Sequence, residues 1–250
     1  MFWDLAGESE EERTQMALNM LEEQVLNESP DSIALIQFES VVGGGGVIVP
    51  PKGYMQGVRA ICNKYNILMH CDEVMVGFGR CGEMFGFQNY DGVIPDIVTA
   101  AKGLSSAALP ISMMATRKHI MDDFEDKPLG WGSTYQAHPV SMACAYENVK
   151  YLIKNDIVGH VKALHPKFDD AMKTISENHP SVKQFRSVGL FGCFDIHTVD
   201  GTNPQLQHHA IDKAFVAYKK VSIFKVANSF YFGSDYSQNF HANRHTLKMV

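Results

Sequence analysis

The chain alternates between helical and strand-like hydrophobic patterns. Apolar residues recur at the spacing of amphipathic helices in four segments, residues 8–28, 54–65, 138–153 and 160–178. Ser9 is followed by Glu12 at the spacing of a capping box, so Ser9 is predicted to be the N-cap of the first helix. Short apolar runs between the helices predict strands at residues 33–39, 67–73, 96–102, 111–115 and 189–196.

This order of elements predicts an α/β fold. Strands that alternate with helices indicate a mostly parallel sheet flanked by helices. The pattern changes near residue 155, which predicts two domains. The larger would occupy residues 1–155, and part of a smaller α+β domain would occupy residues 156–250.

Composition excludes several classes of function. The chain has 22 basic and 28 acidic residues, a formal charge of −6 and no basic stripe, so nucleic acid is not an expected partner. No apolar run approaches the roughly 18 residues of a membrane span. Five cysteines without CxxC spacing argue against a zinc site or a disulfide framework and indicate a reducing compartment. The first residues lack signal-peptide features, so a cytoplasmic location is expected.

Two charged residues close predicted strands of the sheet. Asp72 ends one largely apolar strand, and Lys102 ends another and is followed by Gly103. In parallel sheets the chemistry gathers at the carboxyl ends of the strands. Spacing alone favours a buried salt bridge between the two. A partly desolvated lysine has a lowered pKa, however, and would also serve as an amine nucleophile.

Four motifs resemble those of class III pyridoxal-phosphate-dependent aminotransferases. They are GVIVPPKGY at 46–54, CDEVMVGFGRCG at 71–82, PDIVTAAKGL at 95–104 and GSTYQAHP at 132–139. Within this family, the motifs are similar to those of the taurine–pyruvate and ω-amino acid branch. The resemblance implies a fold-type I transferase that moves an amino group from an amine or ω-amino acid to a keto acid by a ping-pong mechanism.

The resemblance also implies roles for individual residues around pyridoxal 5′-phosphate. Lys102 would bind the cofactor covalently and move protons as general base and acid. Asp72 would keep the pyridine nitrogen protonated, and Val74 would pack on the ring. Ser133 and Thr134 would bind the cofactor phosphate.

Further implications concern partners. The phosphate contact of Thr134 is usually made across a dimer interface in this family, so a homodimer is expected. Glu39 would line the substrate side, although a strand-end charge without a role explains it equally well. No metal site is predicted; the neighbouring residues His208 and His209 are read as exposed side chains without a ligand.

Other functions stay open at this stage. Residues 77–82 fit the GxGxxG pattern of a dinucleotide loop, but poor helix-forming sequence follows them. The resemblance covers about residues 15–200, and the sequence after about residue 220 looks atypical, so the chain reads as a fragment. A catalytically silent fragment that acts through protein binding, or another fold-type I pyridoxal-phosphate enzyme, are the alternatives.

Overall fold

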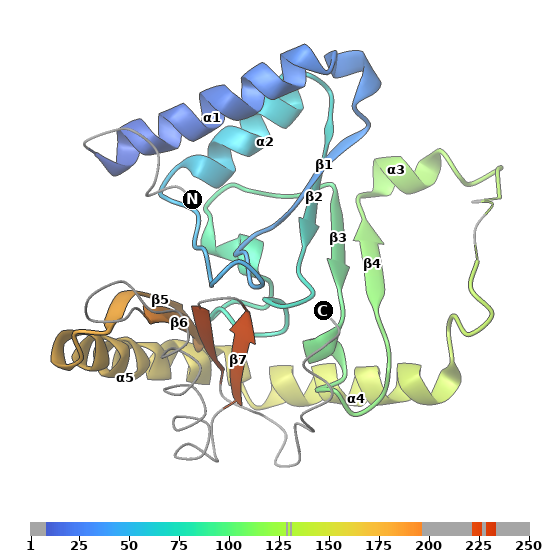
Figure 1. The fold of residues 1–250 in the computed structure, drawn as a ribbon. Helices are drawn as coiled ribbons and strands as arrows, with labels where there is room; N and C mark the ends of the chain where they lie inside the picture. The colour runs from blue at the N-terminus through green and yellow to red at the C-terminus, as the bar shows by residue number, and fades with distance from the viewer. Residues whose placement is uncertain (1–8, 129, 131, 197–221, 227–228, 234–250) are drawn as a thin grey trace.

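The computed structural model describes residues 9–128, 130, 132–196, 222–226 and 229–233. A four-stranded sheet forms the centre of the first part (Figure 1). In spatial order its strands are β1 (Leu35–Glu39), β2 (Leu68–Asp72), β3 (Ile97–Ala100) and β4 (Met113–Thr116). β1, β2 and β3 run parallel, whereas β4 is antiparallel to β3. The prediction of a mostly parallel sheet is therefore confirmed.

Two helices cover one face of this sheet, α1 (Glu10–Asn27) and α2 (Tyr54–Lys64). The capping box is present, because Ser9 Oγ accepts the Glu12 N–H and the Glu12 carboxylate accepts the Ser9 N–H. Alternate residues of β2 point toward the helices. Buried side chains of α2 and β2 share one cluster: Met55, Val58, Cys62, Met69 and Cys71.

Three further helices follow β4: α3 (Lys118–Asp122), α4 (Pro139–Lys154) and α5 (Ile157–Asn178). Short 3-10 helices are η2 (Pro30–Ser32), η3 (Gly86–Asn89) and η4 (Lys102–Leu104). α4 runs beneath the carboxyl end of β3 in Figure 1 and packs there against η4. Among the described residues, no helix has the length and apolarity needed to cross a membrane.

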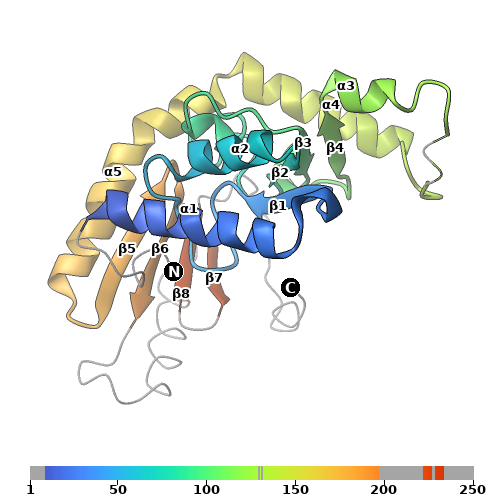
Figure 2. The same cartoon turned by 90° about the horizontal axis from the view of Figure 1, so that it is seen from above.

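A second, antiparallel sheet has the strand order β5-β6-β8-β7. Its strands are β5 (Val182–Val188), β6 (Phe191–Ile196), β7 (Ser222–Val226) and β8 (Ser229–Gly233). Figure 2 shows α5 running alongside β5 and β6. Met172 of α5 is buried together with Val182 and Phe194 of the sheet, which fixes the helix on it.

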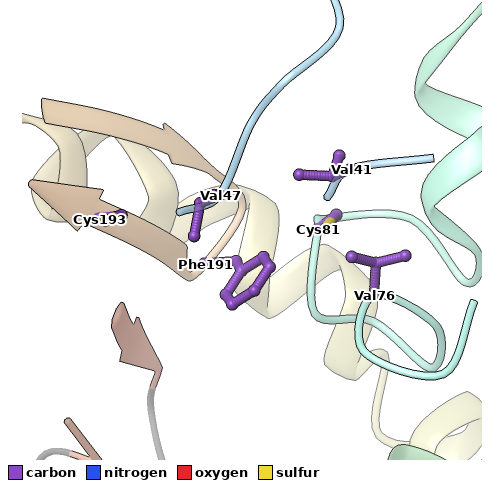
Figure 3. Packing of buried hydrophobic residues seen from close by; sticks show 6 residues of the cluster. All are labelled: Val41, Val47, Val76, Cys81, Phe191 and Cys193. Atoms are coloured by element: carbon purple, nitrogen blue, oxygen red, sulfur yellow. The ribbon is translucent and has the colours of Figure 1, made fainter. Parts of the chain in front are cut away.

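The two sheets are joined by an apolar cluster and by polar contacts. The cluster brings together residues from the loops after β1 and β2 and from β6 (Figure 3): Val41, Val47, Val76, Cys81, Phe191 and Cys193. Arg186 of β5 donates from Nε to the Gly46 carbonyl at 2.8 Å and forms a bidentate pair with Asp195 at 3.0 Å. The loop at Gly43–Gly46 is therefore held from the second sheet.

The structure corrects three details of the sequence prediction. The predicted strand at 96–102 ends at Ala100, because the chain turns into η4 at Lys102. β5 was not predicted, because its sequence VKQFRSV lacks a clear apolar pattern. α5 begins at Ile157 rather than at residue 160, because Asp156 caps it: the Asp156 carboxylate accepts the Gly159 N–H.

Candidate active site

The side chains that could take part in a reaction lie at the carboxyl edge of the parallel strands. Glu39 is the last residue of β1 and stands in register with Asp72, the last residue of β2. Asp72 stands in register with Thr99 of β3. Lys102 follows β3 after one further residue, Ala101. Because the three strands are parallel, their ends meet at one edge, and Asp72 and Lys102 both lie there. The buried salt bridge that spacing favoured is not formed, since Lys102 is exposed and no ion pair joins it to Asp72 among the described residues.

Asp72 is held by the turn that follows it. Its Oδ1 accepts the backbone N–H of Val74 at 2.9 Å. Within the part of the chain that the structure describes, no donor lies at hydrogen-bond distance from Oδ2. A half-buried carboxylate with one unengaged oxygen is suited to bind a donor from a ligand.

His70 lies two residues before Asp72 on the same face of β2. Its Nε2 is 3.0 Å from Thr99 Oγ1. Burial lowers the pKa of His70, and the nearby charge of Asp72 only partly opposes this. His70 is therefore neutral at neutral pH, and it adds no positive charge beside Asp72.

Lys102 sits in an unusual backbone conformation. Its φ is 25°, in a region that residues with a Cβ rarely occupy, and such strain clusters at functional sites. The side chain is solvent-exposed, but the protein around it still removes part of its hydration. This burial lowers the pKa of the Lys102 amine, while the charges of Glu39 and Asp72 act in the opposite direction. The neutral, nucleophilic form is thus more populated than in a free lysine.

Glu39 lies within electrostatic reach of the Lys102 amine. The Glu39 Oε2 accepts the Gly43 N–H at 2.9 Å. A Cβ at Gly43 would come 2.4 Å from Met75 Sδ, so the loop approaches the turn after β2 closely. The loop thereby holds Glu39 at the edge of the site.

The structure does not bring Ser133 and Thr134 to these three residues. Both are exposed, on the connection between α3 and α4 that extends away from the sheet (Figure 1). The Ser133 N–H donates to Gln136 Oε1 at 3.3 Å, a local contact within that connection. Their phosphate-binding role stays a prediction.

Sequence reasoning missed the role of Glu73, which follows Asp72 directly. Its side chain is fully buried and accepts hydrogen bonds from the Ser40 hydroxyl and the Gly86 and Phe87 N–H groups. Burial raises the pKa of Glu73, and these three donors oppose the rise. The only available signal was an acidic pair at a strand end. The partners lie 33, 13 and 14 residues away, and the sequence does not reveal such pairings.

The glycine pattern at residues 77–82 has a structural use. No α-helix follows it; the chain makes turns and then enters η3. A Cβ at Gly77 would lie 2.8 Å from the Glu73 carbonyl oxygen, so the glycine allows a close backbone approach. The helix N-terminus on which a dinucleotide loop relies is absent from this described segment.

Comparison with protein families gives a match over nearly the whole chain. The model of the family described as Aminotransferase class-III matches residues 3–235. The match extends beyond the range of about 15–200 expected from the motifs, so that expectation was too narrow. It also covers β7 and β8, in the region that looked atypical in sequence.

Curated proteins give the same relationship. Gamma-aminobutyrate transaminase 1, mitochondrial, of Oryza sativa subsp. indica is 42% identical over 191 residues. This alignment covers 74% of the chain and 37% of the rice protein. Gamma aminobutyrate transaminase 3, chloroplastic, of Solanum lycopersicum is 40% identical over 196 residues, 76% of the chain and 37% of the tomato protein. The chain thus spans less than half the length of these relatives.

Solved structures share the fold. A taurine:2-oxoglutarate aminotransferase from Bifidobacterium kashiwanohense, solved with PLP and glutamate, has a TM-score of 0.81 and 37% identity over 92% of this chain and 53% of its own. A thermostable omega transaminase from Pseudomonas jessenii has a TM-score of 0.83 and 32% identity over 91% of this chain and 52% of its own. The fold is that of PLP-dependent transaminases.

Proposed function

We propose that this chain, which belongs to the aminotransferase class-III family, carries the lysine-bearing part of a PLP-dependent aminotransferase site. The reaction moves an amino group from an amine or ω-amino acid donor to a keto acid by a ping-pong mechanism. The observation that carries the proposal is that Lys102, whose amine has a lowered pKa, follows β3 at the sheet edge where Asp72 ends β2.

The residues present fit pyridoxal phosphate. An aldehyde needs an amine, and Lys102 offers one that is exposed and more readily neutral than a free lysine. A pyridinium nitrogen needs an anionic acceptor, and Asp72 has a carboxylate oxygen without a donor among the described residues. When bound, the cofactor supplies an electron sink for the transferred amino group. Val74, in the turn after Asp72, would contact the ring.

The chain's own groups then control the protons. The Lys102 amine accepts the proton from the donor's amine-bearing carbon and returns it at the cofactor side, as general base and then general acid. Burial lowers the pKa of this amine, which favours the neutral form that accepts a proton. The fixed carboxylate of Asp72 favours a proton on the group that it faces. The Val74 N–H keeps that carboxylate oriented.

The remaining assignments belong to the same proposal. Ser133 and Thr134 bind the cofactor phosphate, and their exposure on an extended connection suits a contact made across a homodimer interface. Glu39 lines the substrate side, within electrostatic reach of Lys102. The similar proteins are named for γ-aminobutyrate and taurine, which supports a small amine or ω-amino acid as donor.

The visible absorbance spectrum of the purified chain with pyridoxal phosphate tests the proposal. We expect a band from lysine-bound cofactor that disappears in Lys102→Ala and persists in the control Lys118→Ala. Lys118 is a well-exposed lysine of α3 that pairs with Asp122, away from the strand ends. A chain that gives no band, or a band that survives Lys102→Ala, would contradict the proposal and favour a catalytically silent chain.

A further inference from the structure

An asparagine of α4 reaches into the turn that carries Lys102. The side-chain amide of Asn148 donates from Nδ2 to the carbonyl of Gly103 at 2.9 Å and to that of Leu104 at 3.0 Å. Its Oδ1 accepts the hydroxyl of Ser106 at 2.7 Å. One side chain thus binds three of the four residues that follow Lys102, and both ends of its amide are used.

The turn that Asn148 binds is conformationally costly. Lys102, Ser106 and Ala107 all have positive φ, at 25°, 49° and 61°. The turn closes on itself through a hydrogen bond of 3.3 Å from the Ala107 N–H to the Lys102 carbonyl. Residues with a Cβ stay in such conformations only where the surroundings hold them. The contacts of Asn148 are therefore placed where the backbone needs support.

Packing fixes the position of Asn148 relative to the turn. Ala145 and Leu152 of α4 are buried in one cluster with Leu104, the last residue of η4. Asn148 lies between them in sequence, on the same face of the helix. On the other side, a Cβ at Gly103 would lie 2.9 Å from Phe78 Cβ, so the turn is also confined there. The turn cannot move away from Asn148 without breaking this packing.

We propose that Asn148 is a positioning residue, which orients the Lys102 side chain toward the Asp72 carboxylate by fixing the turn from Gly103 to Ser106. It acts through the backbone and does not touch the reacting groups. The proposal deepens the proposed function, and rests on it, because the orientation of Lys102 matters for catalysis only if Lys102 is the cofactor lysine. α4 thereby becomes part of the active-site framework.

A test that needs no cofactor follows from the chemistry of the amine. Full-length chain is labelled with limiting acetic anhydride across a range of pH, and mass spectrometry quantifies acetylation of Lys102 relative to exposed Lys118. The variant is Asn148→Leu, which removes all three hydrogen bonds at similar volume. The control is Asn155→Ala, since Asn155 is an exposed asparagine at the end of α4 whose side-chain amide donates to the Tyr151 carbonyl at 2.8 Å and to no other group among the described residues.

The expected result is a change at Lys102 alone. Once the turn loosens, the side chain becomes better hydrated and its pKa rises toward the ordinary lysine value. A higher pKa reduces the neutral fraction of the amine, and hence its labelling at pH values below the pKa. We expect reduced labelling of Lys102 relative to Lys118 in Asn148→Leu, with no change in Asn155→Ala. A folded Asn148→Leu chain with unchanged Lys102 labelling would overturn the proposal.

A second variant decides if Asn148→Leu does not fold. Ser106→Ala removes a single hydrogen bond and leaves the packing of α4 in place, so a smaller shift in the same direction is expected; unchanged labelling would then overturn the proposal. The two hypotheses fail separately. If the chain gives no cofactor band but shows the labelling shift, only the proposed function is contradicted. If it gives the band but not the shift, only the role of Asn148 is contradicted.

Discussion

At the scale of single residues, the acidic pair at the end of β2 divides into two environments. Asp72 is half-buried and faces the site, whereas Glu73 is fully buried and serves three donors. Tyr90 adds to this region by donating its hydroxyl to the Ser40 carbonyl at 2.9 Å. Glu73 thus connects the loop after β1 to η3 through hydrogen bonds, and Asp72 lies between these two segments in sequence.

Glu73 should make stability depend on pH in a defined direction. Burial raises its pKa in the folded chain above the ordinary value of 4.5. The folded state therefore binds the proton more tightly than the unfolded state, and this contribution to stability is present below pH 4.5. It is lost as pH rises through the folded pKa. In Glu73→Gln the group no longer titrates, so the wild type's advantage in free energy of unfolding should shrink from pH 4.5 to pH 7.5.

Urea denaturation of both chains at several pH values measures this difference. At low pH we expect Glu73→Gln to cost about 1–3 kcal/mol, because a carboxamide leaves one of the two N–H groups without an acceptor. Glu147→Gln on the exposed side of α4 makes the same chemical change where water compensates it. An advantage that grows with pH, instead of shrinking, would show that the hydrogen bonds to the charged form outweigh its burial.

The chemical types at the site were predictable from sequence, and their surroundings were not. Asp72 and Lys102 end apolar runs, so a parallel sheet had to bring them to one edge. Asn148 lies on a helix 42 residues beyond Ser106, its nearest partner in sequence, and nothing local marks it as different from any helical asparagine. Its importance comes from tertiary contacts, which depend on how α4 packs.

At the scale of elements, local signals were reliable where the physical cause was local. The capping box of α1 was found because both partners lie within four residues. The strand before Lys102 was predicted two residues too long because apolar residues continue into the turn. Backbone strain at Lys102 ends the strand, and sequence composition does not encode that strain. β5 was missed because its alternation is interrupted by polar residues and a register shift.

One buried ion pair joins several elements of the first sheet. Asp96, just before β3, binds Arg59 of α2 at 2.6 Å and accepts the Met69 N–H of β2 at 2.9 Å. Burial raises the pKa of Asp96, but the Met69 N–H and the Arg59 charge together bring it below the ordinary value. Arg117, beyond β4, adds a weaker contact at 3.6 Å. Asp96 therefore links α2, β2 and the end of β4.

Removing this carboxylate should destabilise the chain strongly. Asp96→Ala leaves Arg59, whose side chain is 14% exposed, without its buried partner. A loss of about 3–5 kcal/mol in free energy of unfolding is expected. The matched control is Glu22→Ala, which breaks a pair of 2.7 Å between Lys64 of α2 and Glu22 of α1 at the surface. Its loss should be much smaller, and equal losses in the two variants would contradict a special role for the buried pair.

At the scale of the whole molecule, direct contacts hold the two sheets together. The predicted domain boundary near residue 155 stays a prediction, and contacts run across it. Lys162 of α5 pairs with Glu83 at 2.6 Å, and the Leu190 N–H donates to the Arg80 carbonyl at 3.1 Å. The sequence pattern changes near residue 155, but nothing in the sequence indicated that the turn between β5 and β6 packs against the loop after β2.

Gly189, in that turn, is the position at which this contact leaves no space for a side chain. Its φ is 58°, and a Cβ there would lie 2.5 Å from the Cys81 carbonyl carbon and 2.6 Å from both Arg80 O and Gly82 N. All three atoms belong to the backbone, so no side chain can rotate away. Gly189→Ala should lower the free energy of unfolding by about 2 kcal/mol or more, through a left-handed φ and overpacking together.

The control is Gly44→Ala, in the loop after β1. A Cβ at Gly44 meets no atom within 4 Å, and substitution there should leave stability unchanged or raise it by up to about 1 kcal/mol. Urea denaturation gives both values, and hydrogen exchange shows where the structure opens. Because the clash lies between the two sheets, Gly189→Ala should speed exchange at Leu190, whose N–H bridges them, more than in the centre of β2. Equal stability of Gly189→Ala and the unsubstituted chain would mean that the two parts separate freely, and the shared apolar cluster would then not hold them together.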